Sequence, residues 1–548
     1  MKKILLIALL LNASLVINAQ NINAKIDQVF SDWNQKNHPG GVVSIMKKGE
    51  VVFSKAYGLA NIKYKIPNTT ETVFNIGSVS KQFTAMGIVL LNLEGKLSID
   101  DDFRKYLPEL YDFDNKITIR HLLHHTSGFR STPELFGLAG WRDGDPITTE
   151  DDYRYFSKQT SLNFEPGTQF MYTNSGYVLL AKIIEQVTQQ PFSLWMHDNV
   201  FLPLKMASTF VDETNSNTLA QIATPYNQYE PGPFTIGENT SLDIGASNIY
   251  TTANDLTIWM KNFRTPTKGW KLAFDMLQTV DVLNNGSANN YAFGVFLDNF
   301  LGNRRIQHSG GVPGFLSNTA YYPDEDLTIV LLSNFISFIS PEDKYIMLSQ
   351  LLLKDKTPKT EAPQPIKGIA FDSELAKKIA GDYWNDKENY PRRVYAKNDT
   401  LWYLRDNGVQ SPLIQVKAHQ FIIGGIETVV SVEFEEGEKN KMIITDGNSL
   451  PQILEEYDSS PLTTIEKEAY TGQFYSPELE TTYTISLIND QLMGYHSRHG
   501  EFPIGVLKKD VTDWSGMAIV KYTRDEKGET NGIYVDMNRV ENVWFQKK

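Results

Sequence analysis

Two Ser-x-x-Lys tetrapeptides in this chain combine a hydroxyl and an amine at a spacing that can support nucleophilic catalysis. One of them, Ser78 to Lys81, opens a segment over residues 79–93 whose apolar side chains recur at helical spacing. Positions i and i+3 share one face of a helix, so the amine can lie beside the hydroxyl. The positive end of the helix and partial burial both lower the pKa of Lys81, towards a neutral amine that accepts a proton.

The other copy, Ser44 to Lys47, lies in a segment that is typical of a β-strand, residues 42–46. Positions i and i+3 of a strand point to opposite faces of a sheet, so these two side chains cannot cooperate. The nucleophile elbow Gly-x-Ser-x-Gly occurs nowhere in the chain. Ser78 is therefore the predicted nucleophile, with Lys81 as its base.

Tyr172 and Asn174 supply two further polar groups. They follow a Glu-Pro-Gly turn at residues 165–167, in a loop suited to presenting side chains. A phenol beside a lysine can relay protons between nucleophile and leaving group. A side-chain amide can hold a substrate amide because it both donates and accepts. A second Tyr-x-Asn, at residues 383–385, is interpreted as packing within a β-rich tail.

His308 precedes a short glycine run formed by Gly310 and Gly311. Glycine lets a backbone N–H approach a ligand closely. The segment is therefore a candidate for contact with a ligand.

In this order, Ser78-x-x-Lys81, Tyr172-x-Asn174 and His308-x-Gly310 resemble the motifs of the serine β-lactamase-like hydrolases. That group includes class C β-lactamases, D-alanyl-D-alanine carboxypeptidases, D-aminopeptidases and related esterases. The segments at 74–77, 118–128 and 314–315 agree with it, and the resemblance spans about residues 26–350. The tail is similar, more loosely, to the two C-terminal β-barrels of D-aminopeptidases.

The resemblance implies a role for each motif residue. Ser78 would be the acylated nucleophile, and Lys81 and Tyr172 would share the proton transfers as general base and acid. Asn174 would bind the acyl amide, and His308 and Gly310 would line the substrate-binding edge strand facing Tyr172. The N–H groups of Ser78 and Gly311 would form the oxyanion hole.

Two departures from the family pattern bear on the substrate. Class C β-lactamases carry Lys in the third motif, whereas His308 is only partly charged at neutral pH on its reference pKa of about 6.5. This lowers the expectation of strong β-lactamase activity and favours D-aminopeptidase, D-Ala carboxypeptidase or esterase work. The run Gly245 to Asn248 replaces a glycine-richer segment, so the nearby substrate surface is expected to differ.

The elements that must position these residues predict an α+β domain. Hairpins are expected at residues 40–58 and 319–332, and helices at 79–93, 117–125 and 177–187, the first of these ending at Gly95. Strands at both ends with helices between them favour an antiparallel sheet flanked by helices, with a helical lobe. The resemblance gives this fold its name, a β-lactamase/transpeptidase-like domain.

The predicted domain organisation has five parts. They are a signal peptide at 1–19, the hydrolase domain at 26–353, a Pro-containing linker at 354–369, and two β-modules at 370–460 and 461–548. The modules are predicted to be copies, because Gly381 and Gly472 lie 91 residues apart, as do the Asn-Asp pairs at 398 and 489. Each copy has the size of a small closed β-barrel or lipocalin-like module. The alternative is one barrel or sandwich built jointly by both copies.

Composition excludes several classes of protein. The chain has 548 residues, a formal net charge of -13 and no cysteine, so disulfides, thiolate nucleophiles and Cys-ligated metals are ruled out. The acidic balance argues against nucleic-acid binding. His121, His124 and His125 invite a zinc hypothesis, but Leu122 and Leu123 favour a packed helix, so neither a metal nor a cofactor is expected. The oligomeric state is not indicated.

The resulting hypothesis is an exported serine hydrolase, periplasmic or secreted, that lacks a membrane span. It would cleave amides or esters of small molecules or peptides through an acyl-enzyme on Ser78, with D-amino-acid and cell-wall-type substrates favoured. The alternative is a penicillin-binding or wall-fragment sensor that acylates and barely turns over.

Overall fold

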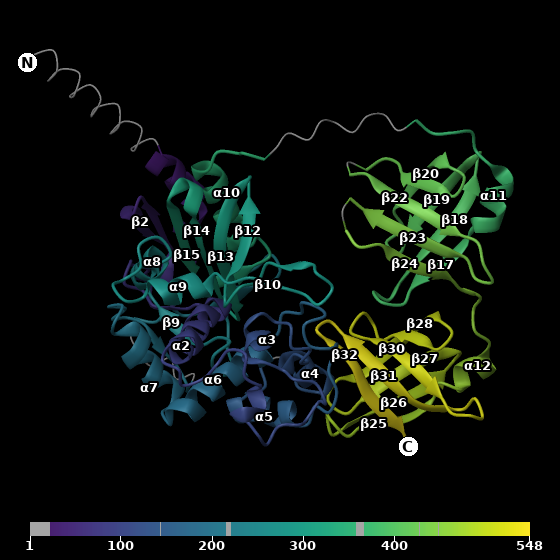
Figure 1. Cartoon of the computed structure of the whole chain (residues 1–548), viewed down its shortest axis with the longest axis horizontal. Helices are drawn as coiled ribbons and strands as arrows, with labels where there is room; N and C mark the ends of the chain where they lie inside the picture. Colours follow the sequence, from purple (N-terminus) through teal and green to yellow (C-terminus); the bar gives the residue numbers. More distant parts are fainter. Residues whose placement is uncertain (1–21, 143, 215–220, 358–366, 427, 448) are drawn as a thin grey trace, which may run out of the picture. The chain divides into compact units, whose positions relative to one another are not determined.

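The computed structural model describes residues 22–142, 144–214, 221–357, 367–426, 428–447 and 449–548 (Figure 1). The chain divides into two compact units, Met1–Thr357 with Arg539–Glu541, and Pro358–Asn538 with Asn542–Lys548. The predicted signal peptide at 1–19 lies outside the described residues, as does most of the predicted linker.

A six-stranded antiparallel sheet forms the centre of the first unit, in the order β12-β13-β14-β15-β1-β2. Its strands are β1 (Gly41–Lys47), β2 (Glu50–Tyr57), β12 (Phe296–Phe300), β13 (Asn303–Val312), β14 (Phe315–Tyr322) and β15 (Leu327–Ser333). The β1–β2 and β14–β15 hairpins are those that the sequence predicts. Gly41 pairs with Ser333, so the first and last parts of the domain meet at the middle of the sheet.

Alternation along β1 separates two cores. Val42 belongs to the larger core, which contains the helical lobe, while Val43 and Ile45 face a second core with the helix at residues 22–29 and α10 (Pro341–Leu352). This follows from the two-residue period of a strand. Helix α8 (Ala253–Lys261) packs on the face opposite α10, where Thr257 donates to the buried Ser44 hydroxyl at 2.9 Å.

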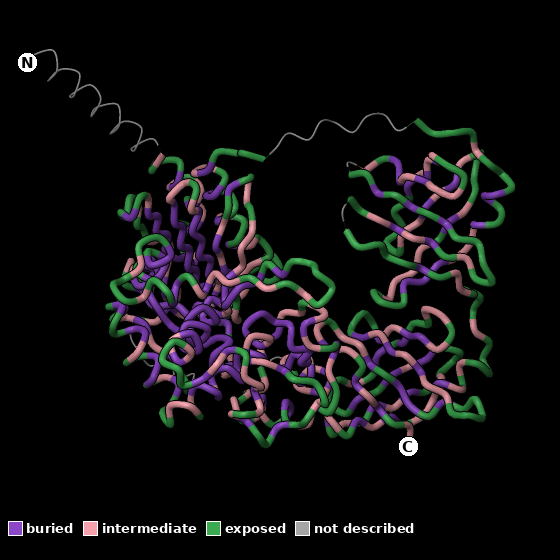
Figure 2. Tube along the Cα trace, in the orientation of Figure 1, coloured by how far each residue is buried: buried purple, intermediate pink, exposed green. Residues whose placement is uncertain are grey.

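The helical lobe surrounds α2 (Lys81–Leu93), most of which is buried (Figure 2). A 3₁₀ turn, η2 (Gly77–Ser80), replaces the first predicted helical residues, and Gly95 ends the segment at φ +70°. The predicted helix at 117–125 is shorter, because Thr118 caps α3 (Ile119–Leu123). The predicted helix at 177–187 is longer, because Thr173 caps α6 (Asn174–Thr188) and so places Asn174 in a helix rather than a loop.

The remaining elements of this unit are short. The helices are η1 (Ser31–Asn34), η3 (Phe103–Lys105), α4 (Thr132–Leu138), α5 (Thr149–Ser157), α7 (Phe192–Met196), η4 (His197–Phe201), α9 (Lys271–Leu277) and η5 (Pro323–Glu325). The strands are β3 (Leu59–Asn61), β4 (Ile66–Pro67), β5 (Phe74–Asn75), β6 (Phe210–Val211), β7 (Tyr226–Gln228), β8 (Thr235–Ile236), β9 (Ile249–Thr251), β10 (Asp281–Val282), β11 (Ala288–Asn289) and β16 (Phe335–Ser337). Strand β5 leads directly into η2, and its pairing with β9 holds that entry in place.

The second unit contains two closed eight-stranded barrels, so the alternative of one joint barrel or sandwich is wrong. The first comprises β17 (Gly381–Asn385), β18 (Tyr390–Lys397), β19 (Thr400–Arg405), β20 (Gln410–Lys417), β21 (Gln420–Ile423), β22 (Val430–Glu435), β23 (Lys441–Asp446) and β24 (Gln452–Glu456), after α11 (Ser373–Ile379). The other comprises β25 (Gly472–Ser476), β26 (Thr481–Ile488), β27 (Gln491–His496), β28 (Gly500–Lys508), β29 (Val511–Asp513), β30 (Ile519–Arg524), β31 (Thr530–Met537) and β32 (Val540–Lys547), after α12 (Thr464–Glu468).

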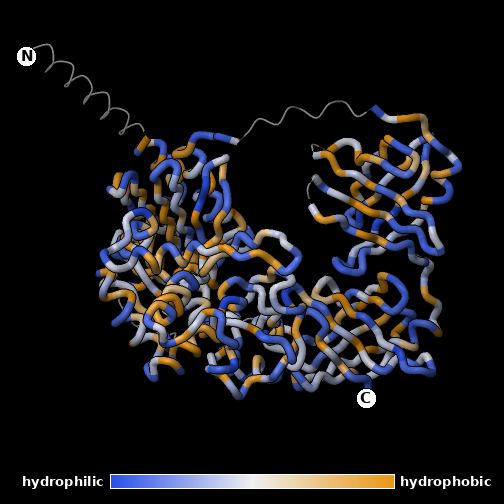
Figure 3. The backbone as a smooth tube through the Cα atoms, in the orientation of Figure 1, coloured by the Kyte–Doolittle hydropathy of each residue, from blue (hydrophilic) through white to orange (hydrophobic). Residues whose placement is uncertain are grey.

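The sequence repeat has a direct structural cause. Gly381 and Gly472 begin equivalent first strands, and the Asn-Asp pairs at 398–399 and 489–490 form equivalent hairpin turns. All four of those turn residues have positive φ, which Asn and Asp tolerate better than most side chains. Blue and orange alternate along the barrel strands in Figure 3, as expected of strands with one face in a barrel core. Within the described residues, no helix has the length and apolar character that crossing a membrane requires.

Candidate active site

The structure brings Ser78 and Lys81 together at the junction of η2 and α2. Lys81 Nζ donates to Ser78 Oγ at 3.2 Å, which is the contact that the i, i+3 spacing predicts. The same nitrogen donates to Asn174 Oδ1 at 2.8 Å and to the carbonyl of Ala246 at 3.0 Å. The oxygens of Asn174 and Ala246 therefore hold the amine beside Ser78 Oγ.

The environment of Lys81 makes it a proton acceptor near neutrality. Its side chain is completely buried, and burial lowers its pKa to about 7. The negative charge of Asp243 works in the opposite direction, and the positive charge of Arg539 adds to the lowering. Near pH 7 a large fraction of the amine is neutral and can take the proton of Ser78.

Tyr172 covers the amine from the other side. Its ring centre lies 4.9 Å from Lys81 Nζ, and burial raises the pKa of its hydroxyl well above the usual value, with the Ser78 hydroxyl opposing that rise. The phenol is therefore protonated at neutral pH and can donate to a leaving group. The proton-transfer role assigned to Tyr172 remains a prediction that this placement permits.

His125 positions the Tyr172 loop, a role that the sequence analysis missed. The N–H of Thr173 donates to His125 Nδ1 at 3.2 Å, and the His125 carbonyl accepts from Met171 N–H at 2.9 Å. The imidazole packs at 4.3 Å from the Tyr172 ring. Burial and the charge of Lys81 lower the pKa of His125 well below its usual value, so the ring is neutral. Its place in a His-Thr-Ser-Gly segment was the available signal.

Asn174 is the first residue of α6, and both ends of its amide are engaged. Oδ1 accepts from Lys81, and Nδ2 donates to Asp243 Oδ2 at 2.9 Å. Binding of a substrate amide by Asn174 remains a prediction. The structure shows that Asn174 links Lys81 to Asp243, a carboxylate that belongs to none of the motifs.

His308 lies on β13 with only 2% of its surface exposed. Nδ1 lies 2.6 Å from the carbonyl of Ser309, which can only accept, so Nδ1 carries the proton and Nε2 accepts from the Tyr291 hydroxyl at 3.1 Å. Burial, with the charge of Lys81, lowers the pKa of His308 to about 3. The expectation of a partly charged His308 is therefore wrong, since the buried ring is neutral at pH 7.

Gly310 and Gly77 allow β13 to lie close against η2. A Cβ on Gly310 would lie 2.1 Å from the Ile76 carbonyl oxygen and 2.9 Å from the Ser78 nitrogen, and one on Gly77 would lie 2.8 Å from the Gly311 nitrogen. Such an approach of two backbones requires glycine. It places the Ser78 and Gly311 N–H groups in the same neighbourhood, as the predicted oxyanion hole needs.

Replacing Gly310 with Ala is expected to lower kcat about 10²-fold, because the added methyl forces β13 away from η2 and separates the two N–H donors. Steady-state kinetics on a phenyl ester measure the loss, and thermal unfolding shows whether the fold persists. Gly232→Ala is the matched control, since a Cβ there meets no atom within 4 Å. A Gly310→Ala enzyme with the kinetics of the control would contradict this account of the oxyanion hole.

The pH dependence of kcat/KM should report Lys81 and not His308. On a neutral ester, kcat/KM is expected to fall about tenfold per pH unit below pH 7, where Lys81 is protonated and cannot accept the Ser78 proton. No inflection should come from His308, which stays neutral down to about pH 3. Profiles of the wild type and of His308→Gln between pH 5 and 9 test this. An acid limb that disappears in the variant would assign the titration to His308 instead.

Three further groups near Lys81 had no role assigned to them in the sequence motifs: the Ala246 carbonyl, Asp243 and Arg539. Ala246, in the run that departs from the family pattern, accepts from Lys81, and the neighbouring Gly245 carbonyl accepts from Thr84 at 2.7 Å. Arg539 belongs to the first unit, donates to Glu134 Oε1 at 2.7 Å, and has its guanidinium carbon 5.9 Å from the centre of the Tyr172 ring. No motif includes Asp243 or Arg539, so only the tertiary structure could identify them.

The other sequence candidates lie elsewhere. Ser44 is buried against α8, and Lys47 pairs with Glu325 at 3.5 Å, so the second Ser-x-x-Lys does not form a site. His121 caps the start of α3, and His124 Nδ1 contacts the Tyr291 carbonyl at 2.7 Å. In the part of the chain that the structure describes, no cluster of three His, Asp or Glu side chains is arranged to hold a metal.

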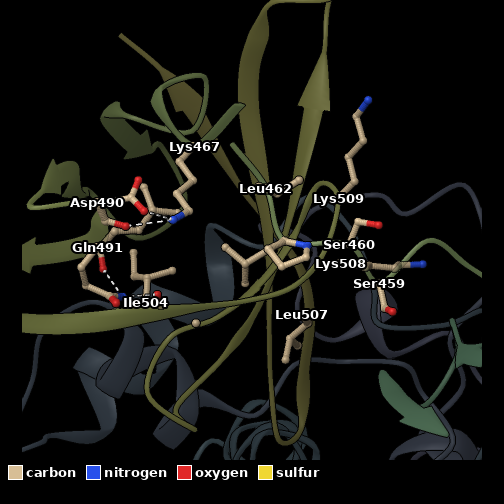
Figure 4. Close-up of a pocket in the computed structure, with 14 residues that line it drawn as sticks. Ser459, Ser460, Leu462, Lys467, Asp490, Gln491, Ile504, Leu507, Lys508 and Lys509 are labelled. Atoms are coloured by element: carbon tan, nitrogen blue, oxygen red, sulfur yellow. Dashed lines mark hydrogen bonds and ion pairs between the residues drawn. The ribbon is translucent and has the colours of Figure 1, made fainter. Parts of the chain in front are cut away.

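A cavity of about 350 Å³ lies in the second unit, beside β27 and β28 (Figure 4). Two of its lysines are already paired, Lys467 with Asp490 at 2.8 Å and Lys508 with Asp386 at 2.7 Å. Neither is free to hold an anion, and Lys509 extends away from the Lys467–Asp490 pair in Figure 4. The predicted catalytic residues are those gathered around Ser78.

Comparisons with known proteins bear on the family and the fold of this chain. A family model described as Beta-lactamase matches residues 22–347. Penicillin-binding protein 4* of Bacillus subtilis (strain 168) is 27% identical over 460 residues, which cover 78% of this chain and 98% of that protein. Protein flp of Staphylococcus aureus (strain N315) is 30% identical over 332 residues, 58% of this chain and 64% of that protein, so the match spans under two thirds of its length.

A solved structure shows the same fold. The octameric penicillin-binding protein homologue from Pyrococcus abyssi aligns with a TM-score of 0.53 at 23% identity, over 80% of this chain and 99% of that one. The expected β-lactamase/transpeptidase-like fold, followed by closed barrels, is thereby confirmed.

Proposed function

The chain belongs to the beta-lactamase family, and on that premise we propose that it is an exported enzyme cleaving amide or ester bonds of D-amino-acid, cell-wall-type substrates. Membership makes it a β-lactamase-fold serine hydrolase. The observation that carries the finer proposal is the 3.2 Å contact between Ser78 Oγ and a buried Lys81 whose pKa is about 7. A hydroxyl so placed can be activated at neutral pH.

The reaction proceeds in two halves. Ser78 Oγ attacks the substrate carbonyl carbon while its proton passes to Lys81, and the oxyanion is held by the N–H groups of Ser78 and Gly311. Collapse expels the amine or alcohol, which takes a proton from the Lys81–Tyr172 pair. Water then attacks the acyl ester and gives a proton to the same pair. The bond from Ser78 Oγ to the acyl carbon breaks, the pair returns a proton to Ser78 Oγ, and the acid is released. We assign these transfers to the pair jointly.

The third motif supports the substrate class. A neutral His308, with both ring nitrogens engaged by Ser309 and Tyr291, supplies no positive charge to attract the carboxylate of a β-lactam. The relative Penicillin-binding protein 4* of Bacillus subtilis is named for binding penicillin, which supports binding of a β-lactam by this chain. Together these favour D-aminopeptidase, D-Ala carboxypeptidase or esterase activity, with weak β-lactamase activity.

A parallel rate comparison tests the substrate class. We expect a D-alanyl anilide, a D-Ala-D-Ala peptide or a short-chain phenyl ester to be cleaved faster than a chromogenic cephalosporin. An L-alanyl anilide is the matched control for stereochemistry. Faster turnover of the cephalosporin than of all three others would reject the proposal in favour of a β-lactamase.

The second candidate is a sensor that acylates and barely turns over, and the name of the relative Penicillin-binding protein 4* supports the penicillin binding that this candidate requires. Intact mass spectrometry after brief exposure to a penicillin separates the two. An adduct on Ser78 that persists for hours, with none of the panel substrates turned over, would establish the sensor.

Export is supported by residues 1–19, where Lys2 and Lys3 precede an apolar run and Ala19 provides a small residue for cleavage. We expect the exported protein to begin at Gln20. N-terminal sequencing of the protein recovered from the periplasm or medium measures this, and an intact Met1 on all of it would contradict export by cleavage.

A further inference from the structure

A polar chain runs from the catalytic lysine into the protein. Lys81 Nζ donates to Asn174 Oδ1 at 2.8 Å, and Asn174 Nδ2 donates to Asp243 Oδ2 at 2.9 Å. Asp243 is 7% exposed and lies in the loop between β8 and β9. The chain therefore ends on a buried carboxylate that neither the motifs nor the mechanism uses.

The chemistry of the groups sets the orientation of the amide. A carboxylate accepts only, so it selects the NH₂ end of Asn174 and leaves Oδ1 to face the amine. The other carboxylate oxygen, Oδ1 of Asp243, accepts from Ser241 Oγ at 2.5 Å. Both carboxylate oxygens of Asp243 therefore accept hydrogen bonds from neighbouring side chains. Without that carboxylate, the Asn174 amide would be free to rotate by 180° and present Nδ2 to Lys81.

The same residue also anchors the other oxygen that holds Lys81. The backbone carbonyl of Asp243 accepts from the N–H groups of Ala246 at 3.0 Å and Ser247 at 2.8 Å. This closes a turn that aims the Ala246 carbonyl at Lys81 Nζ. The side chain of Asp243 orients Asn174, and its backbone carbonyl orients Ala246. Both of these residues accept a hydrogen bond from Lys81 Nζ.

We propose that Asp243 is a positioning residue of this active site: through Asn174 and through the turn to Ala246, it holds the two oxygens that orient Lys81 Nζ beside Ser78. The inference rests on the proposed function, because it assigns Asp243 to the base of that reaction. Asp243 touches neither nucleophile nor substrate and acts through other groups.

Asp152, on α5, is the second carboxyl behind the site. It is 1% exposed, and burial, followed by the charge of Asp243, raises its pKa well above the usual value. Asp152 is therefore the carboxyl that burial and the neighbouring Asp243 hold in its protonated form. The other titratable or charged groups that face Lys81 are Tyr172, Tyr177, His125, His308 and Arg539.

The matched variants are Asp243→Asn, which removes the charge and keeps the shape, Asp243→Ala, which removes the acceptors, and Asp152→Asn, which replaces a neutral carboxyl. Two measurements report the protonation state of Lys81. One is kcat and KM on a neutral ester from pH 5 to 9. The other is carbamoylation of Lys81 by cyanate, measured by peptide mass spectrometry, with the surface residue Lys47 as the internal reference. Cyanate modifies the neutral amine and needs no turnover.

We expect Asp243→Asn to move the midpoint of both readouts to lower pH, because losing the negative charge lowers the pKa of Lys81. In Asp243→Asn, the plateau kcat should fall about tenfold with KM little changed. In Asp243→Ala, kcat should fall further, because the side-chain amide of Asn174 is then free to rotate by 180°. Asp152→Asn should keep the wild-type midpoint. Midpoints unchanged in Asp243→Asn, or moved equally in Asp152→Asn, would overturn the proposal.

A failure of the proposed function would give a different experimental result from a failure of the proposal for Asp243. If no substrate or penicillin acylated Ser78 in the wild-type protein, the proposed function would be rejected, and the cyanate midpoints would still decide the effect of Asp243 on Lys81. Because Asp243→Asn is isosteric, it carries the test even where Asp243→Ala does not fold.

Discussion

Ser78→Ala is expected to abolish turnover of every substrate of this enzyme, with a loss in kcat of at least about 10⁴-fold. The acyl-enzyme requires a covalent bond from Ser78 Oγ to the substrate carbonyl, and no other group replaces that oxygen. The residual rate would come from the oxyanion hole and from binding alone. Steady-state kinetics on the phenyl ester measure the loss, and the mass of the penicillin-treated protein should show no adduct.

The chain supplies its own control for this substitution. Ser44 stands in the same Ser-x-x-Lys spacing but lies on β1, where its hydroxyl accepts from Thr257 at 2.9 Å. Ser44→Ala should keep kcat within about twofold and lower stability by about 1 kcal/mol, the usual effect of one lost hydrogen bond. Full turnover by Ser78→Ala would show that the nucleophile lies elsewhere.

Lys81→Met is expected to carry the second largest effect, a loss of about 10³–10⁴-fold in the rate of acylation. Methionine matches the length of the lysine stem but cannot accept the Ser78 proton. Its substitution also leaves Asn174 Oδ1 and the Ala246 carbonyl without the donor they now share. The time course of adduct formation with a penicillin measures acylation directly, and circular dichroism confirms that the variant is folded.

Lys47→Met is the matched control, because Lys47 makes a surface pair with Glu325 at 3.5 Å and pairs of this kind contribute little. Its acylation rate should equal that of the wild type. If Lys81→Met acylated within about tenfold of the wild-type rate, the base would have to be another group, and Tyr172 would be the first to test.

Much of the site was predictable because its motifs are local. Ser78 and Lys81 are three residues apart, and a helical turn is enough to bring them together. The glycine run after His308 indicates backbone that can approach a ligand closely. The barrel repeat was visible because the hairpin turns at 398–399 and 489–490 need residues that tolerate positive φ.

The charge state of His308 was not predictable from the sequence. A reference pKa assumes solvent around the imidazole, whereas the folded protein buries His308 between Tyr291 and Ser309 and beside Lys81. The helix start at Asn174 was also missed, because the cap by Thr173 outweighs the loop character of the residues before it. The charge state of His308 depends on partners that include the distant Lys81. The start of the helix depends on a cap made by the residue directly before it.

By itself, the sequence determined which residues can react, because nucleophile, base and glycine run are short motifs whose spacing fits one turn or one strand. Only the tertiary structure decided how reactive they are. The pKa of Lys81 and the neutrality of His308 come from burial, and the orientation of Asn174 comes from Asp243, 69 residues further along the chain. Electrostatic interactions act through space and strengthen as water is excluded, so they depend on the fold that brings such residues together.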